Sequence, residues 1–308
     1  MSNKLILLNK LNIKNIKIRN TNTNTNTNIN NTDNNNHNYD NINIDDIITN
    51  NKNTKNAVIL LTRGYTDTRK YEMLINRNKS IEKNLIDKSI DILIFNENNI
   101  TIEQQNHIKK MTPTLNIIFI NILEKAFLTE KKNIKVDKSV DQFSIGYRHM
   151  CSFWFVNFWN FVENYDRVLR IDEDCIIDFN IDKIFYLLND KVAIYGHWER
   201  DCDFVTNGLN NFTLNFLKNN NITIDNKSKN ISGPYTNIIS FNLQILRQNE
   251  IIFKYINEID KSDNIYVWRW GDLPLWGEVL SYFYNKEDHL LTKYIKYYHK
   301  SHNRKVNN

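Results

Sequence analysis

The chain has 308 residues, of which 41% are hydrophobic and 12% aromatic. This length fits one large domain or two small ones, with a sizeable buried core. Lys and Arg exceed Asp and Glu by only 40 to 35 and form no long basic block, which argues against a nucleic-acid partner. The three cysteines, Cys151, Cys175 and Cys202, form no C-x-x-C pair, so we expect a reducing compartment or at most one disulfide.

The first 56 residues have a composition of their own. They contain 21 Asn, including the run "TNTNTNTNINNTDNNNHNYDN". Such a segment cannot bury enough apolar surface to offset the entropy lost on ordering, so we expect residues 1–56 to form a disordered, Asn-rich arm. The apolar run at residues 5–8 is far shorter than the roughly 20 residues of a membrane span or the about 7–15 of a secretory signal. We therefore expect no membrane span and favour a cytoplasmic location.

The following part of the chain alternates between predicted strands and helices. Short apolar runs predict strands at 57–61, 90–98 and 115–122, and helical spacing predicts helices at 68–85 and 101–111, the second capped by Thr101. This order is typical of a parallel sheet with right-handed crossovers, in which ligands bind beyond the carboxyl ends of the strands. The tripeptide "TRG" at 62–64 lies at one such end, although the chain has neither G-x-G-x-x-G nor G-K-[ST].

A further helix is predicted to begin after Ser144, which can act as its N-cap. The aromatic residues at helical spacing along it indicate a buried face: Phe153, Trp154, Phe158, Trp159 and Phe161. The polar residues of its first turn allow two interpretations. Tyr147, Arg148 and His149 fit an anion site at a helix N-terminus, and they fit equally well a solvated first turn.

The segment "RVLRIDEDCIIDFN" (167–180) places three consecutive acids at the end of a predicted buried strand. Three adjacent carboxylates repel one another unless water or a cation shares their charge. Asp172 and Asp174 form an Asp-x-Asp pair, the arrangement in which two carboxylates share a divalent cation with the phosphates of a nucleotide-sugar. The sequence therefore predicts a metal site at this strand end.

Three motifs in order resemble the fungal α-1,2-mannosyltransferases, glycosyltransferase family fifteen. "YRHMCSFW" at 147–154 resembles the family's YRHMCRF, "RVLRID" at 167–172 its W-R-V-E-P strand, and "RWGDLP" at 269–274 its RWGDAP. "ILIFNENNITIEQQNHIKK" is similar to the family's FLND-x-PFT-x-E segment. The resemblance covers about residues 57–302, which we expect to be one glycosyltransferase domain.

The resemblance implies a GT-A-like fold with a mixed, mostly parallel sheet, and retaining transfer of mannose from GDP-mannose with Mn²⁺ or another divalent cation. The acceptor is expected to be a glycan or a glycoprotein. The family's metal-binding Glu falls on Asp172, and its metal-binding His near the C-terminus falls on His299. Asp174 is expected to share the metal. Without the resemblance, the sequence favours His299 as a surface histidine in a polar tail, and only the resemblance makes a ligand role equally plausible.

The resemblance places the family's substrate-site Tyr on Tyr147, and the strand end at Arg63 and the helix start at Arg148 add further donor candidates. Arg63, Tyr147, Arg148 and Asp172 are expected to bind the donor, with Tyr147 and Asp272 of RWGD also assigned to catalysis. The family's N-F-E-I motif, whose Glu is the proposed nucleophile, appears as "NLQI", so that Gln244 takes its place. An amide cannot form a glycosyl-enzyme ester, which leaves a front-face displacement or a catalytically inactive relative that binds sugar or nucleotide. The family works in the Golgi lumen, in contrast to the cytoplasmic location favoured by the sequence.

Overall fold

The apolar run that follows the Asn-rich segment forms the centre of a seven-stranded sheet. The structure is a computed structural model that describes residues 54–223 and 231–307, so the predicted arm lies outside the described residues except for its last three. The strand order is β10-β6-β9-β4-β1-β2-β3. The strands are β1 (Asn56–Leu61), β2 (Asp91–Asn96), β3 (Asn116–Asn121), β4 (Arg167–Ile171), β6 (Ala193–Tyr195), β9 (Ile238–Asn242) and β10 (His289–Leu291).

The sheet is mixed but mostly parallel, as predicted. β4, β1, β2 and β3 run parallel to one another, and β10 runs parallel to β6. β9 is the exception, because it pairs antiparallel with both β4 and β6. The carboxyl ends of β1, β2 and β4 therefore meet at one edge of the sheet, and the end of β9 points to the opposite edge.

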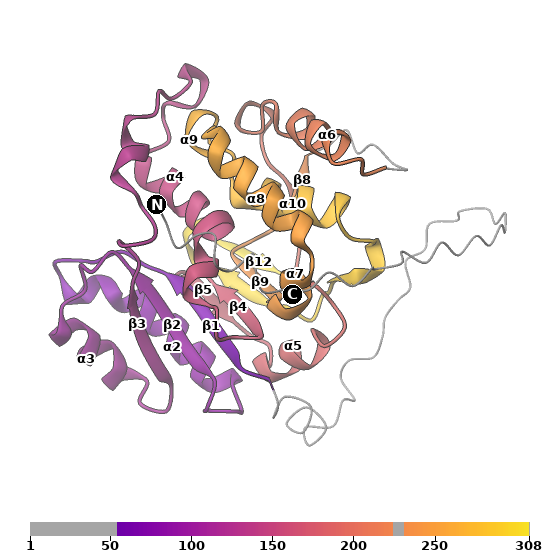
Figure 1. Ribbon diagram of the computed structural model, residues 1–308. Helices are drawn as coiled ribbons and strands as arrows, with labels where there is room; N and C mark the ends of the chain where they lie inside the picture. The colour runs from indigo at the N-terminus through magenta and orange to yellow at the C-terminus, as the bar shows by residue number, and fades with distance from the viewer. Residues whose placement is uncertain (1–53, 224–230, 308) are drawn as a thin grey trace. The chain divides into compact units, whose positions relative to one another are not determined.

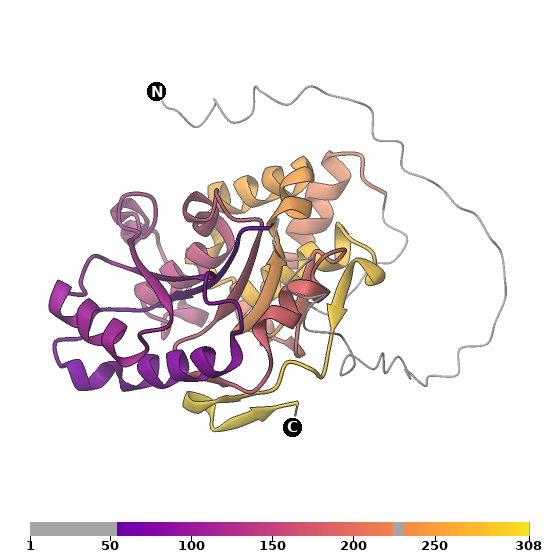
Figure 2. The ribbon, with the colours of Figure 1, turned by 90° about the horizontal axis from the view of Figure 1, so that it is seen from below.

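Helices cover both faces of the sheet (Figures 1 and 2). β1 shows why both faces are buried: Ala57 and Ile59 contribute to one apolar core, and Val58 and Leu60 to the other. The first core also contains residues of α4, α6, α8 and α10, and the second contains residues of α2, α3 and α5. The helices are α2 (Glu72–Asn84), α3 (Ile102–Met111), α4 (Ile145–Ser152), α5 (Ile181–Leu187), α6 (Leu209–Asn219), α7 (Leu243–Gln248), α8 (Glu250–Ser262), α9 (Asn264–Val267) and α10 (Asp272–Tyr282).

Two smaller sheets extend the fold beyond β4. β5 (Cys175–Ile177) pairs antiparallel with β11 (Tyr297–His299), which in turn pairs with β12 (Arg304–Val306). β7 (Trp198–Arg200) pairs with β8 (Ser232–Pro234). The first of these sheets carries the end of the acidic segment, and it brings residues near 299 back to residues near 174.

The local predictions for the helix starts are confirmed. Thr101 caps α3 in a capping box with Gln104, and the Ser144 side chain accepts a hydrogen bond from the backbone N–H of Tyr147. The aromatic face after α4 is core, as expected, since Phe153 and Phe158 are buried. The chain there leaves α-helical geometry for a π-turn and a 3-10 turn between 153 and 161.

All three cysteines are free thiols, so no disulfide joins them. Among the described residues, every helix is too short or too polar to span a membrane.

Close backbone packing fixes α10 against β8. A Cβ on Gly277 would collide with the carbonyl oxygen of Ser232, and a Cβ on Gly233 would collide with the carbonyl oxygen of Leu273. These contacts set the position of α10, whose first residue is Asp272.

Gly277→Ala should lower the free energy of unfolding by about 3 kcal/mol, because the new methyl group must push two backbones apart. Gly146→Ala is the control. Its Cβ would come no nearer than 3.9 Å to the Ser144 hydroxyl, so it should be neutral or gain up to about 1 kcal/mol from helix propensity. Urea unfolding of both variants checks this, and equal midpoints would contradict the close packing.

Candidate active site

The three consecutive acids form the turn between β4 and β5, and their side chains point in different directions. The Glu173 carboxylate accepts hydrogen bonds from the Thr62 hydroxyl and, at 3.0 Å, from the Tyr65 hydroxyl at the end of β1. Asp172 and Asp174 are paired with other residues. The acids thus avoid mutual repulsion by binding separate partners, and Glu173 is a residue for which sequence analysis predicted no role.

Asp174 pairs with His299, whereas the resemblance implied Asp172 and His299 as the two metal ligands. The distance between Asp174 Oδ2 and His299 Nε2 is 3.1 Å, and both side chains are largely buried. The antiparallel pairing of β5 with β11 places His299 opposite Cys175 and so next to Asp174. Burial raises the pKa of Asp174, but hydrogen bonds from His299 and Ser301 outweigh it and bring that pKa to about 2. Asp174 is therefore ionised near neutral pH.

The other ring nitrogen of His299 is held by two residues that sequence analysis missed. His299 Nδ1 lies 3.0 Å from the Tyr235 hydroxyl and 3.0 Å from Asn237 Nδ2. Asn237 is oriented in turn, since its Oδ1 accepts hydrogen bonds from the Tyr297 hydroxyl and the Ile238 backbone N–H. The only sequence signal for these residues is their place directly before a buried strand, "YTNIISFN".

The Asp174–His299 pair fits a divalent cation. Two ligands about 2.1 Å from one ion and at right angles to each other lie roughly 3 Å apart, close to the observed separation. A carboxylate oxygen with an imidazole nitrogen suits Mn²⁺. Cys175 lies within the same group of possible ligands, but burial raises the pKa of its thiol well above the usual value, so it is a poor ligand.

Asp172 is held by a buried arginine instead. Arg170 Nε and Nη2 donate to the two Asp172 oxygens at 2.8 and 3.1 Å, and Nη1 donates to Asp272. The guanidinium also lies 4.2 Å from the centre of the Trp154 ring. The prediction that Asp172 and Asp174 share one metal is therefore not matched by the described geometry, because the Asp172 carboxylate faces Arg170.

A second arginine organises the RWGD loop. Arg269 donates to the Tyr147 hydroxyl at 2.8 Å and to Asp201 Oδ2 at 2.6 Å, and its guanidinium lies over the rings of Tyr147 and Phe143. Its backbone has a φ of 62°, which is strained for an arginine and is found preferentially at functional sites. Because Tyr147 accepts from Arg269, its own proton is free to be donated to a ligand.

Arg63 and Arg148 are placed very differently. Arg63 is exposed at the carboxyl end of β1, with its guanidinium 5.3 Å from the Tyr65 ring, where it can reach an anion. Arg148 is only 1% exposed and donates to the Val140 carbonyl at 2.6 Å. A donor-binding role for Arg148 is not supported, because its guanidinium is enclosed by the fold.

Gln244 does not join the site. β9 runs antiparallel to β4, so Asn242 pairs with Arg167 at the start of β4, about 16 Å along the strand from its acidic end. Gln244 follows Asn242 at that far edge, where it is exposed and donates to Asp166 at 2.8 Å. The described position of Gln244 does not support its predicted catalytic role. A motif match in the sequence does not reveal the direction of the strand that precedes the motif.

Comparison with known proteins gives the chain its relatives. No protein-family model matches it. Over 175 residues it is 27% identical to a Candida albicans protein named glycolipid 2-alpha-mannosyltransferase 2, covering 51% of this chain and 38% of that protein. It is 26% identical over 174 residues to the Schizosaccharomyces pombe O-glycoside alpha-1,2-mannosyltransferase omh1, covering 50% and 43%. The chain is a divergent relative of the fungal α-1,2-mannosyltransferases. It spans about two fifths of the length of these curated relatives.

Solved structures show the same fold. The mannosyltransferase Ktr4p from Saccharomyces cerevisiae in complex with GDP matches with a TM-score of 0.66 at 20% identity, over 80% of this chain and 71% of that one. Core-mannan synthase A from Aspergillus fumigatus, in a form with Mn and GDP, matches with a TM-score of 0.63 at 19% identity, over 80% and 74%. The fold is of the GT-A type, as predicted.

Arg170→Met should remove 3–5 kcal/mol from the free energy of unfolding, the order of magnitude for breaking a buried ion pair, because it leaves Asp272 buried without its partner. Arg69→Met is the matched control, since Arg69 of the Arg69–Asp67 pair is 90% exposed and its loss should leave the free energy of unfolding nearly unchanged. Urea unfolding measures both. Adding Asp272→Asn to Arg170→Met should recover part of the lost free energy of unfolding. If the double variant loses as much free energy as the two single variants together, Arg170 and Asp272 are not coupled and the prediction is contradicted.

His149 should make stability pH-dependent. It is 4% exposed, its Nδ1 lies 3.0 Å from the Tyr266 hydroxyl and its Nε2 has no described partner, so burial lowers its pKa to about 4. His149 takes up a proton near pH 6.5 in the unfolded chain but only near pH 4 in the folded chain. The contribution of neutral His149 to the free energy of unfolding is therefore fully present above pH 6.5 and is lost as the pH falls below that value. We expect a loss of about 2 kcal/mol between pH 7 and pH 5. His149→Gln should remove that part of the pH dependence, and an unchanged slope in urea unfolding would contradict the assignment.

Proposed function

We propose that the chain is a metal-dependent, retaining mannosyltransferase that uses GDP-mannose and transfers mannose to a glycan or a glycoprotein. The observation that carries the proposal is the Asp174–His299 pair at the carboxyl end of β4, in a GT-A fold related to named mannosyltransferases. The relatives with solved structures bind GDP, and one of them binds Mn with GDP. Carboxyl ends of parallel strands are where such sheets bind nucleotides.

Different residues of this chain would bind the cation, orient its histidine ligand and bind the nucleotide phosphates. Asp174 and His299 would hold the cation, while Tyr235 and Asn237 orient the imidazole ring from behind. A bound divalent cation would neutralise the negative charge of the leaving diphosphate. Arg63, exposed at the end of β1, would add a positive charge for the nucleotide phosphates.

The mannose of the donor would lie on the side of the site opposite to the Asp174–His299 pair. Tyr147 can donate its hydroxyl proton to a sugar or phosphate oxygen because Arg269 already donates to that hydroxyl. Asp172 and Asp272 are both paired with Arg170, which lowers their nucleophilicity. We therefore propose a front-face displacement in which the departing phosphate assists the acceptor hydroxyl, without a covalent ester to the chain.

Asp174→Asn should raise the Kd for Mn²⁺ by roughly 100-fold or more, because it removes a direct ligand. Changing a residue that only orients a ligand typically raises a metal Kd by about 10- to 100-fold. Asp178→Asn is the matched control, since Asp178 is an exposed carboxylate at the far end of β5. The free Mn²⁺ signal in electron paramagnetic resonance, recorded with and without GDP, measures both. Equal Mn²⁺ binding by the two variants would overturn the metal assignment.

Transfer is tested with radiolabelled GDP-mannose and other nucleotide-sugars on mannoside acceptors, with EDTA as the control for metal. Metal-dependent transfer from GDP-mannose supports the proposal. Tight binding of GDP and Mn²⁺ without transfer or hydrolysis of any donor would instead favour the alternative of an inactive relative that binds nucleotide or sugar.

A further inference from the structure

A second histidine lies beside the Asp174–His299 pair. His302 Nδ1 is 3.2 Å from His299 Nε2, the same nitrogen that lies 3.1 Å from Asp174 Oδ2. The centres of the two imidazole rings are 4.2 Å apart. His299 Nε2 therefore has both a carboxylate oxygen and a second imidazole nitrogen as close neighbours. Neighbouring ligands about 2.1 Å from one ion lie roughly 3 Å apart, and both of these contacts match that spacing.

The hydroxyl group of Ser301 is in contact with all three side chains. Its oxygen lies 3.0 Å from His302 Nδ1 and 3.4 Å from His299 Nε2, and the hydroxyl forms a hydrogen bond with Asp174. One carboxylate and two imidazoles thus surround a single polar group. Because the His302 side chain is exposed, its ring can turn toward an ion without disturbing the core.

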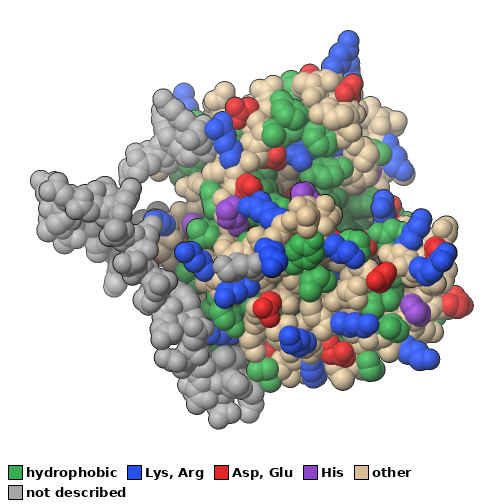
Figure 3. Space-filling view, turned by 180° about the vertical axis from the view of Figure 1, so that it is seen from behind, with side chains coloured by type: hydrophobic (Ala, Val, Ile, Leu, Met, Phe, Trp, Pro, Cys, Tyr) green, Lys and Arg blue, Asp and Glu red, His purple; other side chains and the backbone are tan. Residues whose placement is uncertain are grey.

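The overall charge of the chain makes direct ligands necessary for a cation site. The formal net charge is +5, and Lys and Arg side chains are spread over the face seen in Figure 3. A chain with this charge does not attract a cation from a distance. The affinity for a cation must therefore come from the atoms that touch it, and a third protein ligand would add to that affinity.

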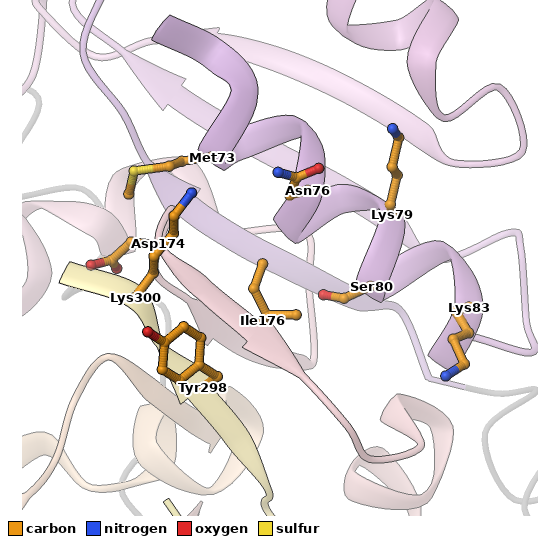
Figure 4. Close-up of a pocket in the computed structure, with 9 residues that line it drawn as sticks. All are labelled: Met73, Asn76, Lys79, Ser80, Lys83, Asp174, Ile176, Tyr298 and Lys300. Carbon is orange, nitrogen blue, oxygen red and sulfur yellow. The ribbon is translucent and has the colours of Figure 1, made fainter. Parts of the chain in front are cut away.

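The lysine next to His299 is directed to the other side of the strand. Successive side chains of a strand point to opposite faces, and Tyr298 and Lys300 line a groove beside α2 (Figure 4). Among the residues that the structure describes, Asp174 is ion-paired with His299 and with no lysine. The Asp174 carboxylate is therefore not neutralised by the nearby ammonium group and remains available to a cation.

The turn that carries His302 is fixed on both sides. It joins β11 to β12, which pair antiparallel, and the backbone N–H of Lys300 donates to the Asp174 carbonyl at 3.0 Å. Asn303 ends the turn with a left-handed backbone, φ 46°, and its side chain accepts a hydrogen bond from the Tyr298 hydroxyl at 2.7 Å. These contacts hold the backbone of the turn against the end of the acidic segment.

We propose that His302 is a third protein ligand of the cation, together with Asp174 and His299. The inference rests on the proposed function, because it takes the cation site from it. Two imidazoles and one carboxylate favour transition-metal ions over Mg²⁺ and Ca²⁺, which prefer oxygen ligands, and favour Zn²⁺ or Co²⁺ over Mn²⁺. Three protein ligands also allow the ion to bind before the nucleotide does.

The first experiment counts the imidazoles on the ion and needs no variant. Mn²⁺ is bound to the full chain without GDP, and electron spin echo envelope modulation detects the nitrogens coupled to it. We expect two imidazoles in wild type. A single imidazole would show that His302 is not a ligand and would overturn the inference.

The second experiment compares His302→Ala with wild type. The matched control is His107→Ala, which removes an exposed histidine on α3. His302→Ala should leave one imidazole on Mn²⁺ and raise the Kd for Mn²⁺ by about tenfold or more, whereas the control should keep two imidazoles and the wild-type Kd. Circular dichroism of both variants should match wild type, because both side chains are exposed. Two imidazoles and an unchanged Kd in His302→Ala would overturn the inference.

Metal preference gives a further readout. Zn²⁺ should displace Mn²⁺ from wild type, whereas a roughly hundredfold excess of Mg²⁺ should not, because Mg²⁺ binds imidazole poorly. The free Mn²⁺ signal in electron paramagnetic resonance measures both competitions. Displacement of Mn²⁺ by Mg²⁺ as readily as by Zn²⁺ would contradict a site with two imidazoles.

The two proposals fail separately. If Mn²⁺ binds through two imidazoles but the chain neither binds GDP nor transfers a sugar, the transferase proposal falls and the three-ligand site remains. If transfer is metal-dependent but the bound Mn²⁺ has a single imidazole, the inference about His302 falls alone.

Discussion

The buried guanidinium of Arg170 is the interaction on which the arrangement of the site depends. It sits at the end of a strand whose five residues are all buried, and it binds Asp172 and Asp272, from segments a hundred residues apart. A charge in such a place is stable only when its partners are present and well oriented. Arg170 therefore fixes the start of α10 relative to the end of β4. This also fixes the position of the RWGD loop, which ends at the first residue of α10.

The same constraint explains why the acidic turn is tolerated. Each of its three carboxylates meets a different partner: Arg170, the hydroxyls at the end of β1, or His299. The turn is consequently a junction at which β1, β4, β11 and α10 are tied together by polar contacts at one edge of an otherwise apolar sheet. Such a junction holds functional groups rigidly, because moving one of them leaves a buried polar group without its partner.

The sequence predicted what depends on local patterns. The strands around 57–61 and 167–171, the caps Thr101 and Ser144, and the aromatic core after α4 all follow from spacing and side-chain chemistry. Contacts between distant segments did not follow from it. Gln244 was misplaced because antiparallel β9 carries it to the wrong edge, and Asn237 and Tyr235 were missed because only the fold brings them to His299. Arg170 itself is a signal in the sequence, because a charged residue between the apolar residues Leu169 and Ile171 of a buried strand needs a buried partner.

The pairing of β5 with β11 also governs when the site comes into being. Asp174 and His299 are 125 positions apart in the sequence, so this carboxylate and this imidazole meet only when β5 pairs with β11. A partly folded chain thus offers no such paired site for a divalent ion. The long-range closure acts as a safeguard, because a transition metal in the cell encounters the complete pair only after the two distant halves of the domain have docked correctly.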